Sequence, residues 1–240
     1  MKKLFDAINK GDFDTVKQVI EKNPVLINSI EKGWRKRDEG LCPLRIAIKN
    51  CHYDIVCFLI DAGANVNDYT PKDDMYISHQ AVYTAVTHCI PKYGLQCGTY
   101  EDSLKILKSL IEHRMDINLT DNNGVNSFFH GVNLSHSMIH STSDMFESDL
   151  PDTLIWNPEF DVNIVYQRFK EVFTLLLEHS ANTDIPDYWK EQSASWEGFN
   201  AKIKWAKNLL NLCNGEKSVE SGPGCTDSDW KRCVPSRQCI

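Results

Sequence analysis

A set of three apolar residues with the spacing i, i+3, i+4 recurs four times along the 240-residue chain. This spacing places the three side chains on one face of an α-helix. The four sets are Val16, Val19 and Ile20; Val56, Leu59 and Ile60; Leu107, Leu110 and Ile111; and Phe173, Leu176 and Leu177. The residues that close the four units are Asn28, Asn67, Asn118 and Asp184. Small helical units of this kind cannot bury their apolar faces alone, so the pattern predicts that they stack in one continuous core.

The clearest unit covers residues 40–67 and has the sequence GLCPLRIAIKNCHYDIVCFLIDAGANVN. It resembles an ankyrin repeat, because Pro43 and Leu44 open one helix, His52 precedes a second helix, and Gly63 lies in the turn that closes it. The resemblance implies two short antiparallel helices and a hairpin finger in each unit. The apolar sets begin 40, 51 and 66 residues apart, whereas ankyrin repeats have a period of about 33 residues. Insertions therefore lengthen the connections.

The predicted fold is an all-α ankyrin-repeat solenoid of four to five helix-turn-helix units, with β-hairpin fingers and long inter-helix insertions. The predicted domain covers residues 1–213, and its units are about 1–39, 40–77, 78–122 and 123–186, followed by a capping region 187–213 with one helix at about 200–213. The longest insertion, about 133–165, falls between the two helices of the fourth unit. Residues 214–240 contain glycine, proline and cysteine without a helical period, which predicts a flexible tail.

Some positions depart from the ankyrin pattern. Cys51 replaces the glycine after the first helix of the second unit, and Arg45 replaces the usual histidine. Arg114 and Ser180 occupy the place that Gly63 fills in the second unit. Glycine suits such helix ends because it adopts a positive φ without a Cβ penalty. The third and fourth units are therefore predicted to be less stable locally than the second.

Composition narrows the class of function. The net charge of −7 does not favour nucleic-acid binding, and apolar runs such as Ile55–Ile60 are too short to span a membrane. The nine cysteines are an odd number and lack the close spacing typical of a disulfide-rich protein. This favours reduced thiols in the cytosol or the nucleus. The cysteines near the C-terminus lack the close pair typical of zinc sites, and no catalytic motif is found. The sequence therefore predicts a monomer with no catalytic residue, no metal and no cofactor.

The fingers contain the candidate binding residues. Trp34 stands beside Arg35 and Arg37 in a lengthened finger, and tryptophan and arginine are enriched at binding hot spots. The ankyrin resemblance implies that the fingers and first helices form a concave ligand face. The predicted partner-binding residues are Trp34, Arg35, Arg37, Tyr69, Lys72, Asp73, Tyr76, Asp121 and Asn122. Because Arg35 can make forked contacts with carboxylates, an acidic or mixed-charge protein partner is expected. Alternatively, this basic finger pairs with the acidic insertion of the same chain.

The sequence thus predicts a non-catalytic protein–protein interaction module. Two alternatives remain open at this point: a substrate adaptor of a larger complex such as a ubiquitin ligase, and a thiol or metal sensor that uses the tail cysteines. The ankyrin resemblance also implies Asn67 as a candidate for asparaginyl hydroxylation.

Overall fold

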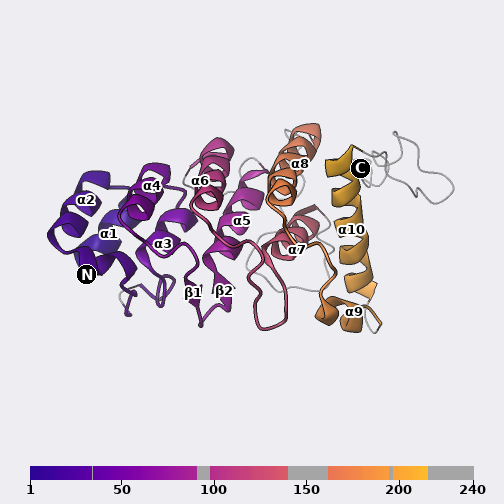
Figure 1. Ribbon diagram of the computed structural model, residues 1–240, viewed down its shortest axis with the longest axis horizontal. Helices are drawn as coiled ribbons and strands as arrows, with labels where there is room; N and C mark the ends of the chain where they lie inside the picture. The colour runs from indigo at the N-terminus through magenta and orange to yellow at the C-terminus, as the bar shows by residue number, and fades with distance from the viewer. Residues whose placement is uncertain (34, 91–97, 140–161, 195–196, 216–240) are drawn as a thin grey trace, which may run out of the picture.

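The computed structural model describes residues 1–33, 35–90, 98–139, 162–194 and 197–215, and these residues are mostly helical, as predicted. The α-helices form pairs that follow one another in a row (Figure 1). The pairs are α1 (Lys2–Lys10) with α2 (Phe13–Lys22), α3 (Pro43–Lys49) with α4 (Tyr53–Asp61), α5 (Ile77–His88) with α6 (Tyr100–Glu112), α7 (Ser127–Ile139) with α8 (Val162–Glu178), and α9 (Asp187–Ser193) with α10 (Glu197–Asn214). A short 3-10 helix, η1 (Pro24–Asn28), follows α2.

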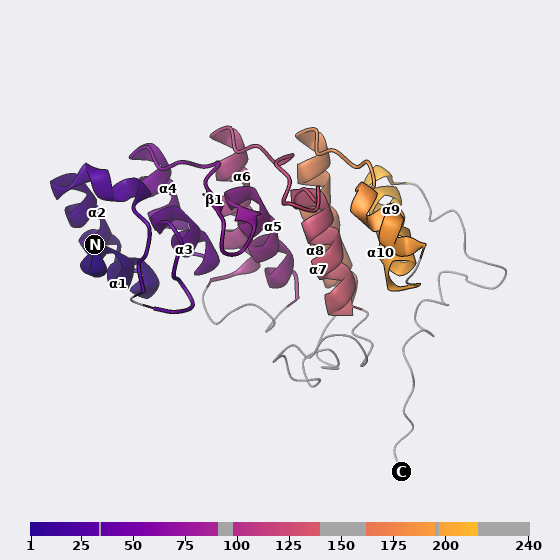
Figure 2. The ribbon, with the colours of Figure 1, turned by 90° about the horizontal axis from the view of Figure 1, so that it is seen from below.

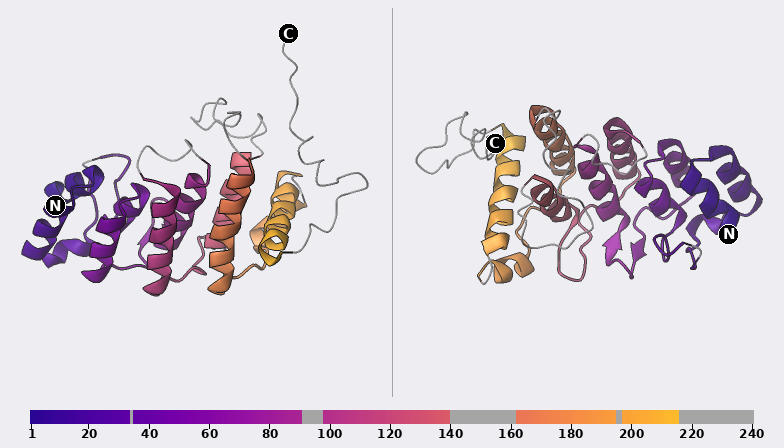
Figure 3. Two further views of the ribbon diagram at one scale, coloured as in Figure 1. Left: turned by 90° about the horizontal axis from the view of Figure 1, so that it is seen from above. Right: turned by 180° about the vertical axis from the view of Figure 1, so that it is seen from behind.

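The first four pairs form two layers. Helices α1, α3, α5 and α7 lie in one layer, and α2, α4, α6 and α8 lie in the other (Figures 1 and 3). Within the first layer, α1 packs on α3, α3 on α5, and α5 on α7, while α10 packs on both α7 and α8. The N-terminus lies at one end of the row and α10 at the other (Figure 2). The two helices of a pair contact each other, and each pair also buries apolar surface against the neighbouring pairs.

The core contains the four apolar sets. Val16, Val56, Leu107 and Phe173, the first members of the sets, are fully buried, with no measurable exposure. Between α5 and α7 the packing is so close that a Cβ on Gly131 of α7 would lie 2.9 Å from Val82 Cγ1 of α5. The predicted helix faces are thus confirmed by burial, and they join into one hydrophobic cluster that runs from Leu4 to Leu209.

Several helices of the row end in left-handed backbone. Gly63 has a φ of 94°, and Arg114 and Ser180 adopt 67° and 63° at the corresponding helix ends. Cys51, which replaces a glycine in the second unit, has a φ of 57°. Left-handed backbone costs a residue with a Cβ about 1–2 kcal/mol. The positions that lack glycine therefore do hold the conformation that glycine favours.

Replacing Arg114 or Ser180 with glycine is expected to stabilise the protein by about 0.5–1 kcal/mol. The stabilisation from relief of backbone strain is partly offset by the greater conformational freedom of glycine in the unfolded chain. Urea unfolding of each variant measures the change. Gly63→Ala is the matched control, because nothing lies within 4 Å of the added Cβ and only the backbone strain changes; it should lose about as much as the others gain. A loss of stability in both glycine variants would contradict this account.

The fingers differ from the predicted hairpins. We define the first finger as residues 29–42, the second as 68–76 and the third as 119–126. Among the described residues, only the second contains strands, β1 (Tyr69–Thr70) paired antiparallel with β2 (Met75–Tyr76). The first finger closes through backbone hydrogen bonds between Glu31 and its partners Gly40 and Leu41, without regular strands. The prediction of β-hairpin fingers is therefore correct for the second finger and wrong for the first and the third, as far as their residues are described.

The C-terminal third also departs from the prediction. Helix α7 continues to Ile139 and α8 begins at Val162, so the ends of the expected insertion 133–165 are helical, and residues 140–161 lie outside the described part. Instead of one capping helix there are two, α9 and α10. The short helix α9 is held by Trp189, whose ring lies 5.1 Å from that of Phe129 and 6.0 Å from that of Phe199. A helix of seven residues with a single buried side chain has no apolar set to reveal it.

Candidate functional site

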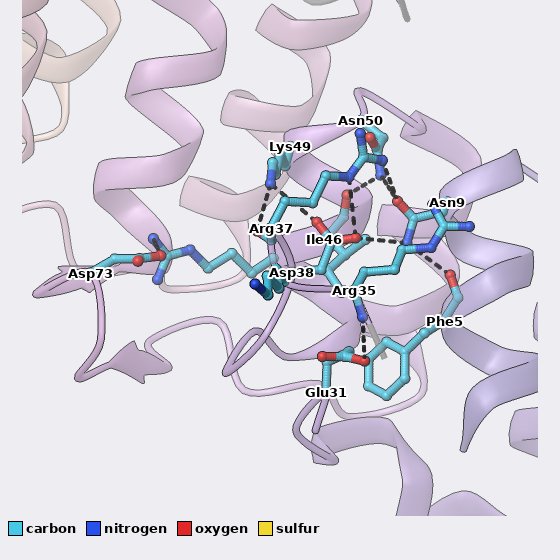
Figure 4. A network of polar contacts seen from close by, with 12 residues as sticks. Phe5, Asn9, Glu31, Arg35, Arg37, Asp38, Ile46, Lys49, Asn50 and Asp73 are labelled. Atoms are coloured by element: carbon cyan, nitrogen blue, oxygen red, sulfur yellow. Dashed lines mark hydrogen bonds and ion pairs between the residues drawn. The ribbon is translucent and has the colours of Figure 1, made fainter. Parts of the chain in front are cut away.

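The first finger is tied to α1 and α3 around a buried carboxylate (Figure 4). The Asp38 side chain is only 1% exposed. Its Oδ1 lies 3.1 Å from Lys49 Nζ, and its Oδ2 accepts a hydrogen bond from Asn9 Nδ2 at 3.2 Å. The Arg37 guanidinium lies 3.5 Å away. A buried charge persists only when it is paired and hydrogen-bonded, so this network fixes the path of the finger.

The predicted anchors of the first finger make contacts within the chain. Arg35 Nη2 lies 3.2 Å from Asp6 Oδ1 of α1, and Arg37 Nη2 donates to Asn9 Oδ1 at 3.1 Å. The Arg37 side chain remains 61% exposed, whereas that of Arg35 is 35% exposed. Trp34 lies outside the described residues. Arg37 is therefore the more accessible guanidinium, and Arg35 is partly used in holding the finger to α1.

A buried arginine supports the second finger. Arg45 is only 2% exposed, donates to the Met75 carbonyl oxygen, and pairs with Asp73 Oδ2 at 3.2 Å. Burial lowers the pKa of Arg45, while the negative charge of Asp73 opposes this effect. Lys72 turns toward the first finger, where its Nζ lies 3.2 Å from the Lys36 carbonyl oxygen. Asp73 and Lys72, predicted as binding residues, thus also connect elements of the fold. Arg45 was identified in the sequence only as a departure from the usual histidine.

A cluster of four rings lies where the second finger meets α5 and α7. We call it the tyrosine–imidazole cluster, and its members are Tyr69, Tyr76, His79 and His130. The ring centroids of Tyr69 and Tyr76 are 4.8 Å apart, and those of Tyr76 and His79 are 5.7 Å apart. His79 and His130 stack at 4.2 Å. Two of the predicted binding residues, Tyr69 and Tyr76, are thereby brought together, and both are half-buried. The histidines come from α5 and α7 and were not predicted as part of this surface.

Two carboxylates complete the rim of this cluster. Tyr69 Oη donates to Asp74 Oδ1 at 2.8 Å, and this bond to a carboxylate raises the pKa of the tyrosine. The Asn122 backbone N–H donates to Asp74 Oδ2 at 3.0 Å, which joins the third finger to the second. Asp121 Oδ2 lies 3.1 Å from His130 Nε2. Burial alone would raise the pKa of Asp121, but hydrogen bonds to its carboxylate outweigh burial and lower it. Asp121 and Asn122, which are also among the predicted binding residues, thus contact this cluster through His130 and Asp74.

His79 is held as a neutral ring. The Tyr76 backbone N–H donates to His79 Nδ1 at 3.3 Å, so the proton is on Nε2, which donates to the Leu119 carbonyl oxygen at 3.0 Å. Burial, together with the neighbouring His130, lowers the pKa of His79 to about 4. Protonation of Nδ1 would lose the bond from Tyr76 and place a charge in the core. The depressed pKa therefore follows from the packing of the cluster.

The fold is expected to lose about 2 kcal/mol of stability through His79 between pH 7 and pH 5. The ordinary pKa of histidine, 6.5, lies above the folded-state value. The unfolded chain therefore binds the proton first, and stability falls as the pH falls from about 6.5 toward 4. Urea unfolding of wild type and His79→Gln across this pH range separates the contribution of His79 to stability from the contributions of nearby Asp121 and Arg45. Identical pH profiles for the two proteins would contradict this assignment.

The closing asparagines bridge successive units. Asn67 Oδ1 accepts from the Asp116 backbone N–H at 2.8 Å, and its Nδ2 donates to the Arg114 carbonyl oxygen at 3.3 Å. Asn118 makes the same pair of bonds, to the Asn182 N–H at 2.7 Å and to the Ser180 carbonyl oxygen at 3.0 Å. The oxygen and the nitrogen of each side-chain amide are thus both hydrogen-bonded. We call these contacts the asparagine bridges, and they give the asparagine at the end of a unit a structural role.

The described residues offer little support for thiol or metal chemistry. Burial raises the pKa of the Cys42 thiol to about 12, and it also raises the pKa of Cys89 and Cys213. The remaining tail cysteines, Cys225, Cys233 and Cys239, lie outside the described part. No group of three or more histidine, cysteine or acidic side chains suited to a metal is found within the described ranges. In the same ranges, no helix is both long and apolar enough to cross a membrane.

Comparison with known families gives a match to part of the chain. The model of the family described as the ankyrin repeat matches residues 39–71. This segment begins near the end of the first finger and continues through α3 and α4 into the second finger. The chain therefore contains an ankyrin repeat, and the resemblance predicted from the sequence is confirmed for this unit. Ankyrin repeats are generally non-catalytic modules of protein–protein interaction.

Proposed function

We propose that the whole row of helix pairs is an ankyrin-repeat solenoid and that the protein binds a protein partner through its fingers and first-layer helices. The observation that carries the proposal is the tyrosine–imidazole cluster with its rim of Asp74 and Asp121. It joins two fingers and two first-layer helices, and its tyrosine rings remain half-buried rather than enclosed. Half-exposed aromatic side chains held rigidly by neighbours are typical of binding hot spots.

The partner-binding role includes the first finger. Arg37 and Lys36 are exposed there, beside the bonds that fix the finger to α1 and α3. Because the finger is anchored before any partner binds, little conformational entropy is lost in ordering it. Substrate adaptors bind clients in the same manner, so an adaptor role is one version of this function. The sensor alternative concerns the cysteines near and in the tail; of these the structure describes Cys213, and the pKa of its thiol is raised by burial, which argues against its use as a reactive thiol.

The proposed solenoid works as a monomer whose end is closed by α10. Buried Phe199 and Trp205 face the row, whereas Lys204, Lys207 and Asn208 are exposed on the outward side of the helix. A polar outer face is what a terminal repeat needs to end the stack in water. Light scattering coupled to size-exclusion chromatography tests this point, and a stable dimer would contradict it.

Affinity capture with the full chain as bait tests the proposed function. We expect Tyr69→Ala combined with Asn122→Ala to lose at least about 2 kcal/mol of affinity for a captured partner, roughly thirtyfold. Lys105→Ala combined with Lys108→Ala, on the exposed side of α6, is the control and should bind normally. Melting curves establish that both variants fold. A partner whose binding is reduced only by the α6 control would place the interface elsewhere and overturn the proposal.

Asn67 remains a proposed site of hydroxylation. Its amide oxygen and nitrogen both take part in an asparagine bridge, so an enzyme must first open this bridge to reach the side chain. Mass spectrometry after incubation with an active asparaginyl hydroxylase tests the proposal, and an unmodified Asn67 would dismiss it.

A further inference from the structure

The two carboxylates of the tyrosine–imidazole cluster have no cationic partner from lysine or arginine among the described residues. Asp74 accepts hydrogen bonds from Tyr69 Oη and the Asn122 N–H, which are neutral donors. Asp121 accepts from backbone N–H groups of Asn123 and Val125 and from the His130 ring. Their negative charge is therefore oriented by the fold without a lysine or arginine to balance it.

The cationic side chains of Arg45 and Lys72, beside and in the second finger, pair with other residues. Arg45 pairs with Asp73, and Lys72 lies against the first finger, where its Nζ is also 3.8 Å from Glu39 Oε2. Between Arg114 and Arg168 the sequence contains no lysine or arginine at all. The third finger and α7 therefore contribute no such cation to this part of the surface, which stays negative.

The tyrosine rings supply a second type of recognition beside this charge. Tyr69 and Tyr76 are half-buried and tilted at 42° to one another, next to Asp74. The face of a tyrosine ring attracts cations, and the attraction grows when the cation is partly removed from water. A carboxylate held next to aromatic faces matches a planar cation that can both stack on the rings and donate two parallel hydrogen bonds to the carboxylate.

We infer that the cluster binds an arginine side chain of the protein partner, with its guanidinium against Tyr69 and Tyr76 and paired with Asp74. The inference rests on the proposed function and specifies the partner's chemistry at this part of the surface. Arginine fits better than lysine because its guanidinium is planar, stacks on aromatic rings and is less strongly hydrated than an ammonium group. The partner therefore presents a basic residue here, opposite in sign to the acidic residues expected near the first finger.

A fluorescent nonapeptide with two arginines in a glycine–serine background tests the inference against the full chain by fluorescence anisotropy. Matched peptides replace both arginines with lysine or with glutamine. We expect the arginine peptide to bind roughly fivefold more tightly than the lysine peptide, and the glutamine peptide not to bind. Equal or tighter binding of the lysine peptide, or no binding of the arginine peptide, would overturn the inference.

Two charge-matched variants locate the binding. Asp74→Asn should weaken binding of the arginine peptide roughly fivefold or more. Asp54 is exposed on α4, and Asp54→Asn should change the affinity for this peptide by less than about twofold. Tyr76→Leu, checked for folding by its melting curve, should abolish the preference for arginine over lysine. Equal weakening by Asp74→Asn and Asp54→Asn would show general charge attraction and overturn the inference.

Competition separates this inference from the proposed function. If a captured partner is lost with Tyr69→Ala and Asn122→Ala but the arginine peptide fails to displace it, the inference is wrong and the proposed function stands. If neither the peptide nor the variants affect any captured partner, both are wrong. Displacement by the arginine peptide, but not by the lysine or glutamine peptides, supports both.

Discussion

Leu110→Ala should destabilise the protein by about 2–5 kcal/mol. Leu110 is fully buried on α6, which packs on α4 of its own layer and on α5 of the other layer. The substitution removes apolar surface from the core and leaves a cavity that close-packed neighbours fill only in part. Because successive helix pairs share one core, the loss should appear in the cooperative transition of the array. Urea unfolding followed by circular dichroism measures it.

Val25→Ala provides the control for this substitution. Val25 is 84% exposed, so its truncation should change the free energy of unfolding by less than about 0.5 kcal/mol. A metal chelator or a reductant should leave the unfolding transition of the wild type unchanged, because packing holds the array. If either reagent unfolds the protein while Leu110→Ala leaves it unaffected, packing is not what stabilises this fold.

Asp38→Asn should cost about 2–3 kcal/mol of stability. The change removes the charge that compensates Lys49 and supports Arg37, while the volume of the side chain is kept. Breaking a buried pair by removing one partner typically costs about 3–5 kcal/mol. The effect should be smaller here because Lys49 is 25% exposed and Arg37 is 61% exposed, so both cations recover some hydration. Thermal unfolding at pH 7 measures the difference.

The neighbouring residue supplies a matched control. Glu39→Gln also removes one negative charge from the first finger, but the Glu39 side chain is 52% exposed and lies 3.8 Å from Lys72. An exposed pair of this kind contributes about 0–1 kcal/mol. If Glu39→Gln destabilises the protein as much as Asp38→Asn, the buried network does not have the role assigned to it.

The helices of the row could be predicted because the apolar spacing that identifies a helix lies within one short stretch of sequence. Apolar residues three and four apart, such as Leu107 and Leu110, identify a helix face within one short stretch of sequence. Helix α9 was missed because Trp189 is its single buried residue, and that burial depends on Phe129, sixty residues earlier. Hairpin strands in the first finger were predicted wrongly because a family resemblance does not reveal how Asp38 redirects this particular loop.

The candidate site was predictable in composition but not in arrangement. Tyr69 and Tyr76 could be selected because aromatic residues in a finger are typical of interfaces. The contribution of His79 and His130 could not, because their stacking depends on how closely α5 packs on α7. The same holds for Arg45, whose pairing with Asp73 spans 28 positions in the sequence. Long-range contacts of this kind follow from packing, which residue spacing does not encode.

The asparagine bridges and the exposed ion pairs of this molecule respond differently to ionic strength. The bonds of Asn67 and Asn118 join neutral amides to backbone groups, so dissolved ions screen them little. The exposed contacts that position the first finger include charge pairs such as Lys72 with Glu39, which ions do screen. Raising the ionic strength should therefore loosen the finger relative to the helices while the spacing between units stays fixed. The spacing between units is thus independent of ionic strength, whereas the exposed ion pairs of the first finger, outside its buried Asp38 network, depend on it.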